Sequence, residues 1–244
     1  MVMNNRLYEW SALTLLLVLH FAVFGPNIIT KTLCSLLFMY IGYNQWRQKR
    51  DGGMIPIFVF IALILAMIGD VLLAIPNGFM PGGFSFLLCH VFYTLSFVVS
   101  FWKNFVRTRE RVVSVMIPVL CALALYFYGY YCVVLNIQDR SADILVIPYL
   151  YVISTMTALS SGGQSMMTPS SLLSFIKNLL YKTFMRGEPF SEMERTYLRV
   201  MGAVLFGISD IFVARQQFLD KSPNNALIGL PIYYVAQNFI AYSI

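Results

Sequence analysis

Long apolar segments recur along the whole chain, and they constrain its fold more than any other feature. They fall at residues 7–25, 28–45, 54–76, 84–105, 112–134, 143–161, 197–218 and 226–243. A helix of about 20 residues, rising 1.5 Å per residue, spans a bilayer core of ~30 Å. The pattern predicts an all-α integral membrane protein with eight transmembrane helices, in a single transmembrane domain over residues 1–244.

The charged residues indicate how these helices are oriented. Only 11% of the residues are charged, and the basic ones lie in short loops between apolar runs, so the net charge of +6 does not indicate a nucleic-acid partner. Thirteen Lys and Arg residues lie on the side of the N-terminus and four on the other side. Under the positive-inside rule, both termini are expected in the cytoplasm, in a multi-pass protein of a bacterial inner membrane or a eukaryotic endomembrane.

One long connection, residues 161–195, separates the sixth and seventh apolar runs. Its apolar residues recur at helical spacing and are Leu172, Leu173, Phe175, Ile176, Leu179, Leu180 and Phe184. Lys177, Lys182 and Arg186 lie elsewhere on the same helix, which is typical of an amphipathic helix in the lipid headgroup region. The three basic residues disfavour an additional span. We therefore expect an interfacial insertion that contacts the membrane surface.

Five ionisable residues lie well inside the predicted spans: His20, Lys31, Asp70, His90 and Asp210. Counted from the non-cytoplasmic ends of their helices, all five lie roughly 5 to 12 Å below the same surface. Because an ionised carboxylate in hydrocarbon is costly, an Asp at such a depth indicates a functional site. The shared depth predicts one polar cavity, in the non-cytoplasmic third of the protein.

Two similar segments indicate an internal repeat. Residues 67–74 read MIGDVLLA and residues 207–214 read GISDIFVA, each with an Asp followed by apolar residues and Ala. A repeat displaced by four helices keeps its orientation in the membrane, so we expect two parallel four-helix repeats, about residues 1–110 and 111–244. The two Asp residues would then lie at equivalent depths.

The span that follows each of these segments carries two polar side chains at positions i and i+3. They are His90 with Tyr93 and Tyr234 with Gln237, a spacing that places each pair on one helix face. We expect the two pairs to form facing walls around Asp70 and Asp210. Two further tyrosines expected to face the Asp pair are Tyr151 and Tyr233.

Asp70 and Asp210 are the candidate catalytic residues. Two carboxyl groups close together in a low-dielectric pocket cannot both stay ionised, so one holds its proton while the other acts as a base. This arrangement suits general acid–base hydrolysis without a metal or other cofactor. A divalent ion bound by both carboxylates and His90 is the competing use, although no HxxxH, HxxE or DxxD spacing supports it. Lys31 and Arg215 are candidates for binding an anionic headgroup.

The segments over residues 69–97, 202–218 and 230–244 resemble the YhhN family of eight-span membrane proteins, whose characterised members are lysoplasmalogenases. The resemblance covers the whole topology, and its specific motifs lie in the third, fourth, seventh and eighth spans. It implies a lysophospholipid substrate in the membrane, lysoplasmenyl-ethanolamine or lysoplasmenyl-choline. Hydrolysis of its vinyl ether bond would release a fatty aldehyde and a glycerophospho-amine.

The resemblance also assigns residues. The two proposed catalytic acids of the family match Asp70 and Asp210, and its histidine and tyrosine match His90 and Tyr93. Tyr234 and Gln237 match the polar positions of the last span. The chain departs from the family pattern in two places: Thr32 follows Lys31 where many members have Pro, and the segment 161–195 is longer than expected.

A proton-coupled transporter or a lipid flippase is the alternative function, because parallel repeats and intramembrane Asp residues also occur in such proteins. Transporter sites usually lie near the bilayer midplane, whereas these acids are expected away from it, which favours the enzyme. A non-catalytic scaffold would tolerate substitution of both Asp residues.

Overall fold

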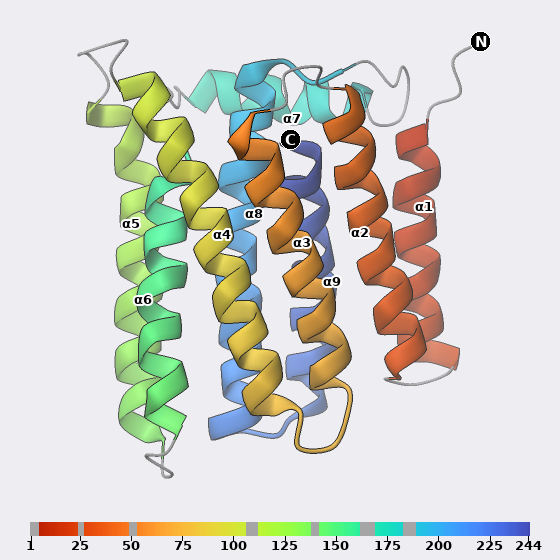
Figure 1. The fold of residues 1–244 in the computed structure, drawn as a ribbon, viewed down its shortest axis with the longest axis vertical. Coiled ribbons are helices and arrows are strands. Elements are labelled where there is room, and N and C mark those ends of the chain that lie inside the picture. The colour runs from red at the N-terminus through yellow and green to blue at the C-terminus, as the bar shows by residue number, and fades with distance from the viewer. Residues whose placement is uncertain are drawn as a thin grey trace.

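The computed structural model of this chain describes residues 5–23, 27–48, 53–105, 112–137, 142–161, 169–182 and 189–244. These residues contain helices and turns and no strand, so the predicted all-α fold class is confirmed. Within them, one set of α-helices runs side by side along the long axis (Figure 1): α1 (Asn5–Val18), α2 (Ile28–Gln48), α3 (Met54–Leu73), α4 (Phe79–Phe105), α5 (Val112–Tyr128), α6 (Asp143–Leu159), α8 (Glu192–Ala214) and α9 (Pro223–Tyr242). Helix α7 (Pro169–Tyr181) lies across one end of this bundle.

Four described segments are long and apolar enough to cross a membrane on their own. They are Met54–Leu73, Phe79–Trp102, Pro118–Asn136 and Glu192–Leu219, while the apolar helix α6 is shorter. Helices α2 and α9 have sufficient length but carry polar side chains on their buried faces, among them Ser35 and Gln237. Such inward polar residues lower the average hydropathy of a helix whose outer face is apolar. The prediction of eight spans is thus supported for four of them.

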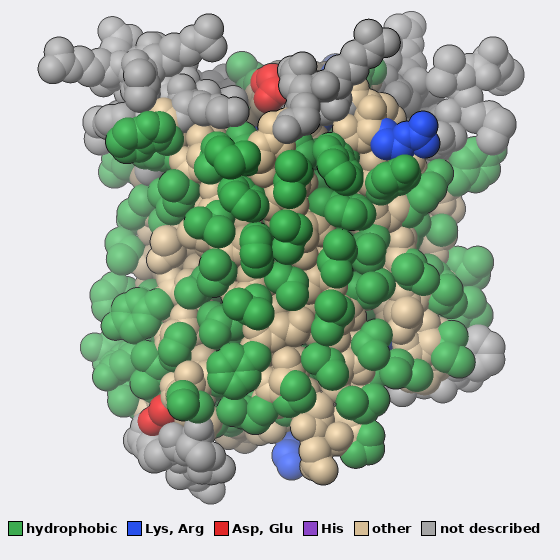
Figure 2. Space-filling model, viewed as in Figure 1, with side chains coloured by type: hydrophobic (Ala, Val, Ile, Leu, Met, Phe, Trp, Pro, Cys, Tyr) green, Lys and Arg blue, Asp and Glu red, His purple; other side chains and the backbone are tan. Residues whose placement is uncertain are grey.

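The outer surface of the bundle is apolar. Hydrophobic side chains cover the middle of the face in Figure 2, whereas the charged side chains visible there lie near its two ends. Large exposed apolar residues occur on many helices, including Leu15, Leu33, Leu88, Leu120 and Ile144. A soluble protein does not expose so wide an apolar area, but a lipid-facing surface requires it. The protein is therefore a membrane protein.

Local sequence signals set several helix ends. Helix α4 begins at Phe79, before the predicted start at residue 84, because Pro81 lies in the first turn, where its missing N–H breaks no helical hydrogen bond. Helix α8 begins at Glu192 rather than at residue 197. A capping box explains this start, since the Glu194 N–H donates to Ser191 Oγ and the Ser191 N–H donates to the Glu194 carboxylate.

The amphipathic helix expected within the segment 161–195 is confirmed, and it is α7. Helix α7 buries Phe175, whose ring stacks on Tyr197 of α8 with 4.6 Å between centroids, and exposes Ile176 and Lys177. Residues 162–168 and 183–188 lie outside the described residues. So do several of the basic residues used to predict orientation: Lys49, Arg50, Arg107, Arg109, Arg111, Arg140 and Arg186. Helix α1 begins and α9 ends at the end of the bundle where α7 lies (Figure 1).

Candidate active site

A cavity of about 590 Å³ lies between α3, α4, α5, α6, α8 and α9. Asp70 and Asp210 both line it, as does Lys31 of α2. The cavity extends to the end of the bundle opposite α7, where Asn77 from the α3–α4 turn and Asn225 from the start of α9 contribute polar groups. Of the five residues predicted to share one polar cavity, Lys31, Asp70 and Asp210 line it, whereas His20 and His90 do not, and most of its lining residues are apolar.

The turn at this end is closely packed. A Cβ atom on Gly78 would lie 1.7 Å from the carbonyl oxygen of Leu72, so only glycine fits there, and the preceding Asn77 has a φ of 59°. At the same end, α5 and α8 continue into π-helical turns, η2 (Gly129–Val133) and η6 (Arg215–Leu219), and both turns line the cavity. Such π-helical turns are frequent at functional sites.

Asp70 lies on α3 and is held by two hydroxyl groups. It is 3% exposed. Its Oδ2 atom accepts hydrogen bonds from Ser35 Oγ of α2 at 2.6 Å and from the Tyr233 hydroxyl of α9 at 2.9 Å. Lys31 shares the cavity but forms no ion pair with Asp70 in the described structure. All the direct side-chain partners of Asp70 are therefore neutral.

A chain of hydrogen bonds behind Tyr233 fixes the direction in which it donates. The Tyr93 hydroxyl donates to Gln237 Oε1 at 2.6 Å, and Gln237 Nε2 donates to the Tyr233 oxygen at 3.3 Å. Because Tyr233 accepts this bond, its own proton is available for Asp70. Tyr93 and Gln237 are thus connected to Asp70 indirectly, by the hydrogen bonds of Tyr233.

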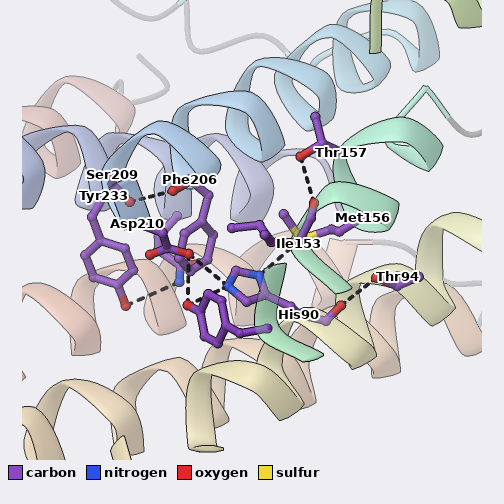
Figure 3. Close-up of polar contacts among 11 residues, drawn as sticks. His90, Thr94, Ile153, Met156, Thr157, Phe206, Ser209, Asp210 and Tyr233 are labelled. Carbon is purple, nitrogen blue, oxygen red and sulfur yellow. Dashed lines mark hydrogen bonds and ion pairs between the residues drawn. The ribbon is translucent and has the colours of Figure 1, made fainter. Parts of the chain in front are cut away.

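Asp210 lies on α8 and has a different set of partners. Its Oδ2 atom is 3.1 Å from His90 Nε2 and accepts a hydrogen bond from the Tyr149 hydroxyl at 2.9 Å. The His90 side chain is fully buried, and its other ring nitrogen, Nδ1, lies 3.4 Å from Met156 Sδ. Figure 3 shows the imidazole of His90 between Asp210 and Met156. Asp210 therefore has a partner that can carry a positive charge.

The two carboxyl groups share no hydrogen-bond partner among the described residues. Asp70 is bound from α2 and α9, and Asp210 is bound from α6 and α4. Each is thus held by one helix from its own half of the chain and by the last helix of the other half. The two sites differ in chemistry, since one has hydroxyl donors alone and the other has an imidazole.

Other predicted residues lie further from the carboxyl groups. The Tyr234 hydroxyl donates to the Lys31 carbonyl at 3.4 Å, so Tyr233 rather than its neighbour contacts Asp70. Arg215 donates to the Tyr128 hydroxyl at 3.3 Å. It follows α8 directly, at the end of the bundle opposite α7, where the cavity has its mouth. Tyr151 is 55% exposed and lies on the outer surface, which contradicts its expected position.

His20 is buried with its Nδ1 atom 2.5 Å from Thr30 Oγ1, outside the lining of the cavity.

Sequence reasoning missed three side chains of the site: Ser35, Tyr149 and Met156. Ser35 follows Lys31 by one helical turn, and this spacing, which places both on the same helix face, is the signal that could have identified Ser35. Tyr149 was hidden among fifteen tyrosines. Among the described residues, no group of three or more His, Cys, Asp or Glu side chains could hold a metal ion.

The outer surface of the bundle is apolar, and two carboxyl groups line one cavity inside it. These features define a membrane protein with its candidate site between the helices. The sequence profile of the YhhN family matches residues 26–244, and the chain belongs to this family. The resemblance seen in the sequence motifs is thereby confirmed. No curated protein and no solved structure matches the chain significantly.

Proposed function

We propose that the protein is a membrane-embedded hydrolase that cleaves the vinyl ether bond of a lysoplasmalogen to a fatty aldehyde and a glycerophospho-amine. One observation carries this proposal: two carboxyl groups line a single apolar cavity, one among neutral donors and the other beside an imidazole. Membership of the YhhN family supports the same reaction class.

The reaction needs an acid and a base in one water-accessible pocket. Acid hydrolysis of a vinyl ether begins with protonation of the double-bond carbon that does not carry oxygen, which gives an oxocarbenium ion. Water then adds to this ion, and the hemiacetal that forms collapses to aldehyde and alcohol. A neutral carboxylic acid must therefore supply the first proton, and a carboxylate must stabilise the cation and accept a proton from water.

Asp70 is the proton donor in this proposal. A carboxylate buried in apolar surroundings needs a charged partner, and the direct side-chain partners of Asp70 are the hydroxyls of Ser35 and Tyr233. Both bonds go to Oδ2, so a proton on Oδ1 is compatible with them. Asp210 is the carboxylate, because His90 can pair with it as an imidazolium.

The cycle returns both carboxyl groups to their starting states. Asp70 gives its proton to carbon, and Asp210 then takes a proton from the attacking water. When the hemiacetal collapses, its hydroxyl proton goes to Asp70 while Asp210 protonates the leaving glycerol oxygen. The balance is one vinyl ether and one water consumed for one aldehyde and one alcohol.

The cavity suits a single-chain amphiphile. Its walls are largely apolar and include Leu125, Leu150 and Ile153, whereas Lys31 and the amides of Asn77 and Asn225 lie towards the mouth. An alkenyl chain would occupy the apolar part, and Lys31 would meet the phosphate. Arg215, next to the lining residue Gln216, would attract the headgroup at the mouth.

We also propose the eight-span architecture with two parallel four-helix repeats. The packing supports a pseudo-two-fold relation, since α2 packs on α9 as α6 packs on α4. Phe79 and Phe218, which follow the two Asp residues at similar distances along the chain, meet with ring centroids 5.5 Å apart. With the termini in the cytoplasm, the cavity would open on the non-cytoplasmic side.

Aldehyde release by the purified full-length protein in detergent tests the proposal. We expect aldehyde from lysoplasmenyl-ethanolamine and none from the matched saturated ether lipid, because only the vinyl ether can be protonated at carbon. Asp70→Asn and Asp210→Asn should each abolish release while thermal unfolding stays cooperative. Folded wild-type protein that releases no aldehyde, but moves protons or lipid in proteoliposomes, would establish the transporter or flippase instead.

A further inference from the structure

The imidazole of His90 lies between two side chains of one helix. Tyr149 and Met156 are both on α6 and are seven residues apart, so they lie two turns apart on the same helix face. The Tyr149 hydroxyl is 2.9 Å from Nε2 of His90, and Met156 Sδ is 3.4 Å from Nδ1. The ring of Phe206 packs on the imidazole with 4.5 Å between centroids. These contacts hold the ring in one orientation, with Nδ1 toward Met156 (Figure 3).

The Nδ1 atom of His90 depends on Met156. In the part of the chain that the structure describes, Met156 Sδ is the hydrogen-bond partner of this nitrogen. His90 and Met156 are both fully buried, and neither lines the cavity, so both lie out of contact with bulk water. A thioether sulfur accepts hydrogen bonds and cannot donate them. Nδ1 is therefore bonded when it carries a proton, whereas without a proton it is left unpaired in a buried site, which is costly.

The Nε2 atom of His90 faces Asp210. Nε2, the Tyr149 hydroxyl oxygen and Asp210 Oδ2 lie 2.9 to 3.1 Å from one another. A proton on Nδ1 is compatible with two arrangements here. Either an imidazolium donates its Nε2–H to the Asp210 carboxylate, or Nε2 of a neutral imidazole accepts from a neutral Asp210 carboxyl group. Both arrangements keep Nδ1–H bonded to Met156. A neutral ring with its proton on Nε2 leaves Nδ1 bare instead.

Asp210 is the carboxyl group that balances a charge on the ring. Among the described residues, it is the acidic side chain within ion-pair distance of His90. The remaining titratable side chains beside the ring are Tyr149 on α6 and the fully buried Cys89 and Tyr93 on α4. Phenol and thiol groups are uncharged near neutral pH. An imidazolium at this position is therefore balanced by Asp210.

We propose that Met156 is a positioning residue that holds a proton on Nδ1 of His90. The imidazolium of the proposed reaction is then hydrogen-bonded at both nitrogens, to Met156 and to Asp210. Met156 thereby stabilises Asp210 as the carboxylate that accepts a proton from water. It acts through His90 and does not touch the substrate, because it does not line the cavity. The effect on catalysis rests on the proposed hydrolase, whereas the position of the proton can be measured without it.

Nitrogen NMR of the full-length protein in detergent, with isotope-labelled histidine, tests where the proton lies. The chain has two histidines, so His20→Gln leaves the signals of His90 alone. Near neutral pH we expect Nδ1 to carry a proton in this background. Met156→Leu keeps the size of the side chain and removes the acceptor. The ratio of bare to protonated Nδ1 should therefore rise roughly two- to tenfold, which is the effect of one hydrogen bond.

Initial rates of aldehyde release give a second measurement. In Met156→Leu, kcat should fall roughly two- to tenfold, while KM stays unchanged because the lost sulfur lies outside the cavity. Met39→Leu makes the same change at a partly buried position of α2 and is the matched control. It should have the rates and the His90 signals of the wild type. An unchanged kcat in Met156→Leu, beside a changed Nδ1 signal, would refute the part of Met156 in catalysis.

Several NMR results would overturn the position of the proton. A bare Nδ1 in the His20→Gln protein would show that the ring carries its proton on Nε2. An unchanged signal in Met156→Leu, or an equal change in Met39→Leu, would show that the sulfur does not hold the proton. If His20→Gln does not fold, the labelled wild type and Met156→Leu are compared directly, and identical histidine signals refute the role. If the wild type releases no aldehyde but Nδ1 responds to Met156→Leu, the hydrolase fails while the position of the proton is confirmed.

Discussion

Replacing Tyr233 by Phe tests the assignment of Asp70 most directly. The substitution removes the hydroxyl that donates to Asp70 Oδ2 at 2.9 Å and keeps the ring that packs on Phe86 and Phe206. If Asp70 gives up a proton in the rate-limiting step, the bond strengthens as negative charge develops on the carboxylate. A hydrogen bond to a charged group contributes about 1.5 to 3 kcal/mol, and one to a neutral group about 1 kcal/mol.

The difference, about 0.5 to 2 kcal/mol, corresponds to a roughly 2- to 30-fold fall in kcat. KM should change little, because the lost hydroxyl faces Asp70 rather than the substrate. The free energy of unfolding should also fall, by about 1 to 3 kcal/mol, since buried Gln237 Nε2 loses its acceptor. Initial rates of aldehyde release over a range of substrate concentrations, with thermal unfolding in parallel, measure both effects.

Tyr234→Phe is the matched control. The residue is adjacent and equally buried, but its hydroxyl makes a longer contact, at 3.4 Å to the Lys31 carbonyl. We expect kcat to change by less than about twofold, because the loss of a weak neutral contact does not act on the developing charge. Equal losses in the two variants, or an unchanged kcat in Tyr233→Phe, would refute the role given to Asp70.

Three further substitutions examine the base, the cavity and the insertion. His90→Gln removes the ionisable partner of Asp210, so kcat for aldehyde release should fall roughly 10²- to 10⁴-fold. A fall of less than about tenfold would contradict the pairing of His90 with Asp210. Gly207→Ala would place a Cβ atom 2.5 Å from a Leu125 methyl group inside the cavity, so KM should rise more for long alkenyl chains than for short ones. An equal rise for both would show that the alkenyl chain of the substrate binds elsewhere. Phe175→Ala removes the ring that packs α7 on α8 and should lower the free energy of unfolding by about 3 to 5 kcal/mol, measured as a lower thermal unfolding midpoint. An unchanged midpoint would show that other contacts hold α7 on α8.

Much of the fold could be predicted because apolar length is a one-dimensional signal. The runs of about 20 apolar residues correspond to the described helices of the bundle, and the spacing of apolar residues after residue 169 indicated α7. The ends were less accurate, because they depend on capping and on proline position, as at Ser191 and Pro81. Hydropathy alone was weakest for α2 and α9, since their buried faces carry the polar residues of the site.

The sequence could bring the two Asp residues to one cavity, but it could not give the rotation of each helix about its axis. Counting residues from helix ends placed Asp70 and Asp210 on one level, and both line the cavity. Which of two neighbouring tyrosines points inward depends on the rotation of the helix about its axis, and the sequence does not define that angle. Tyr149 therefore contacts Asp210 while Tyr151, two positions on, is exposed, and Tyr233 rather than Tyr234 contacts Asp70.

The partners of the two carboxyl groups explain why neither half of the chain can form the site alone. Asp70 comes from α3 but takes its tyrosine from α9, and Asp210 comes from α8 but takes its histidine from α4. Separation of the halves would leave both carboxyl groups in an apolar interior without a main donor, which is costly for each. The polar contacts at the site thus hold the two halves in register. The same exchange gives one carboxyl group a hydroxyl partner and the other an imidazole. In the proposed reaction, this difference between two otherwise similar segments makes Asp70 the acid and Asp210 the base.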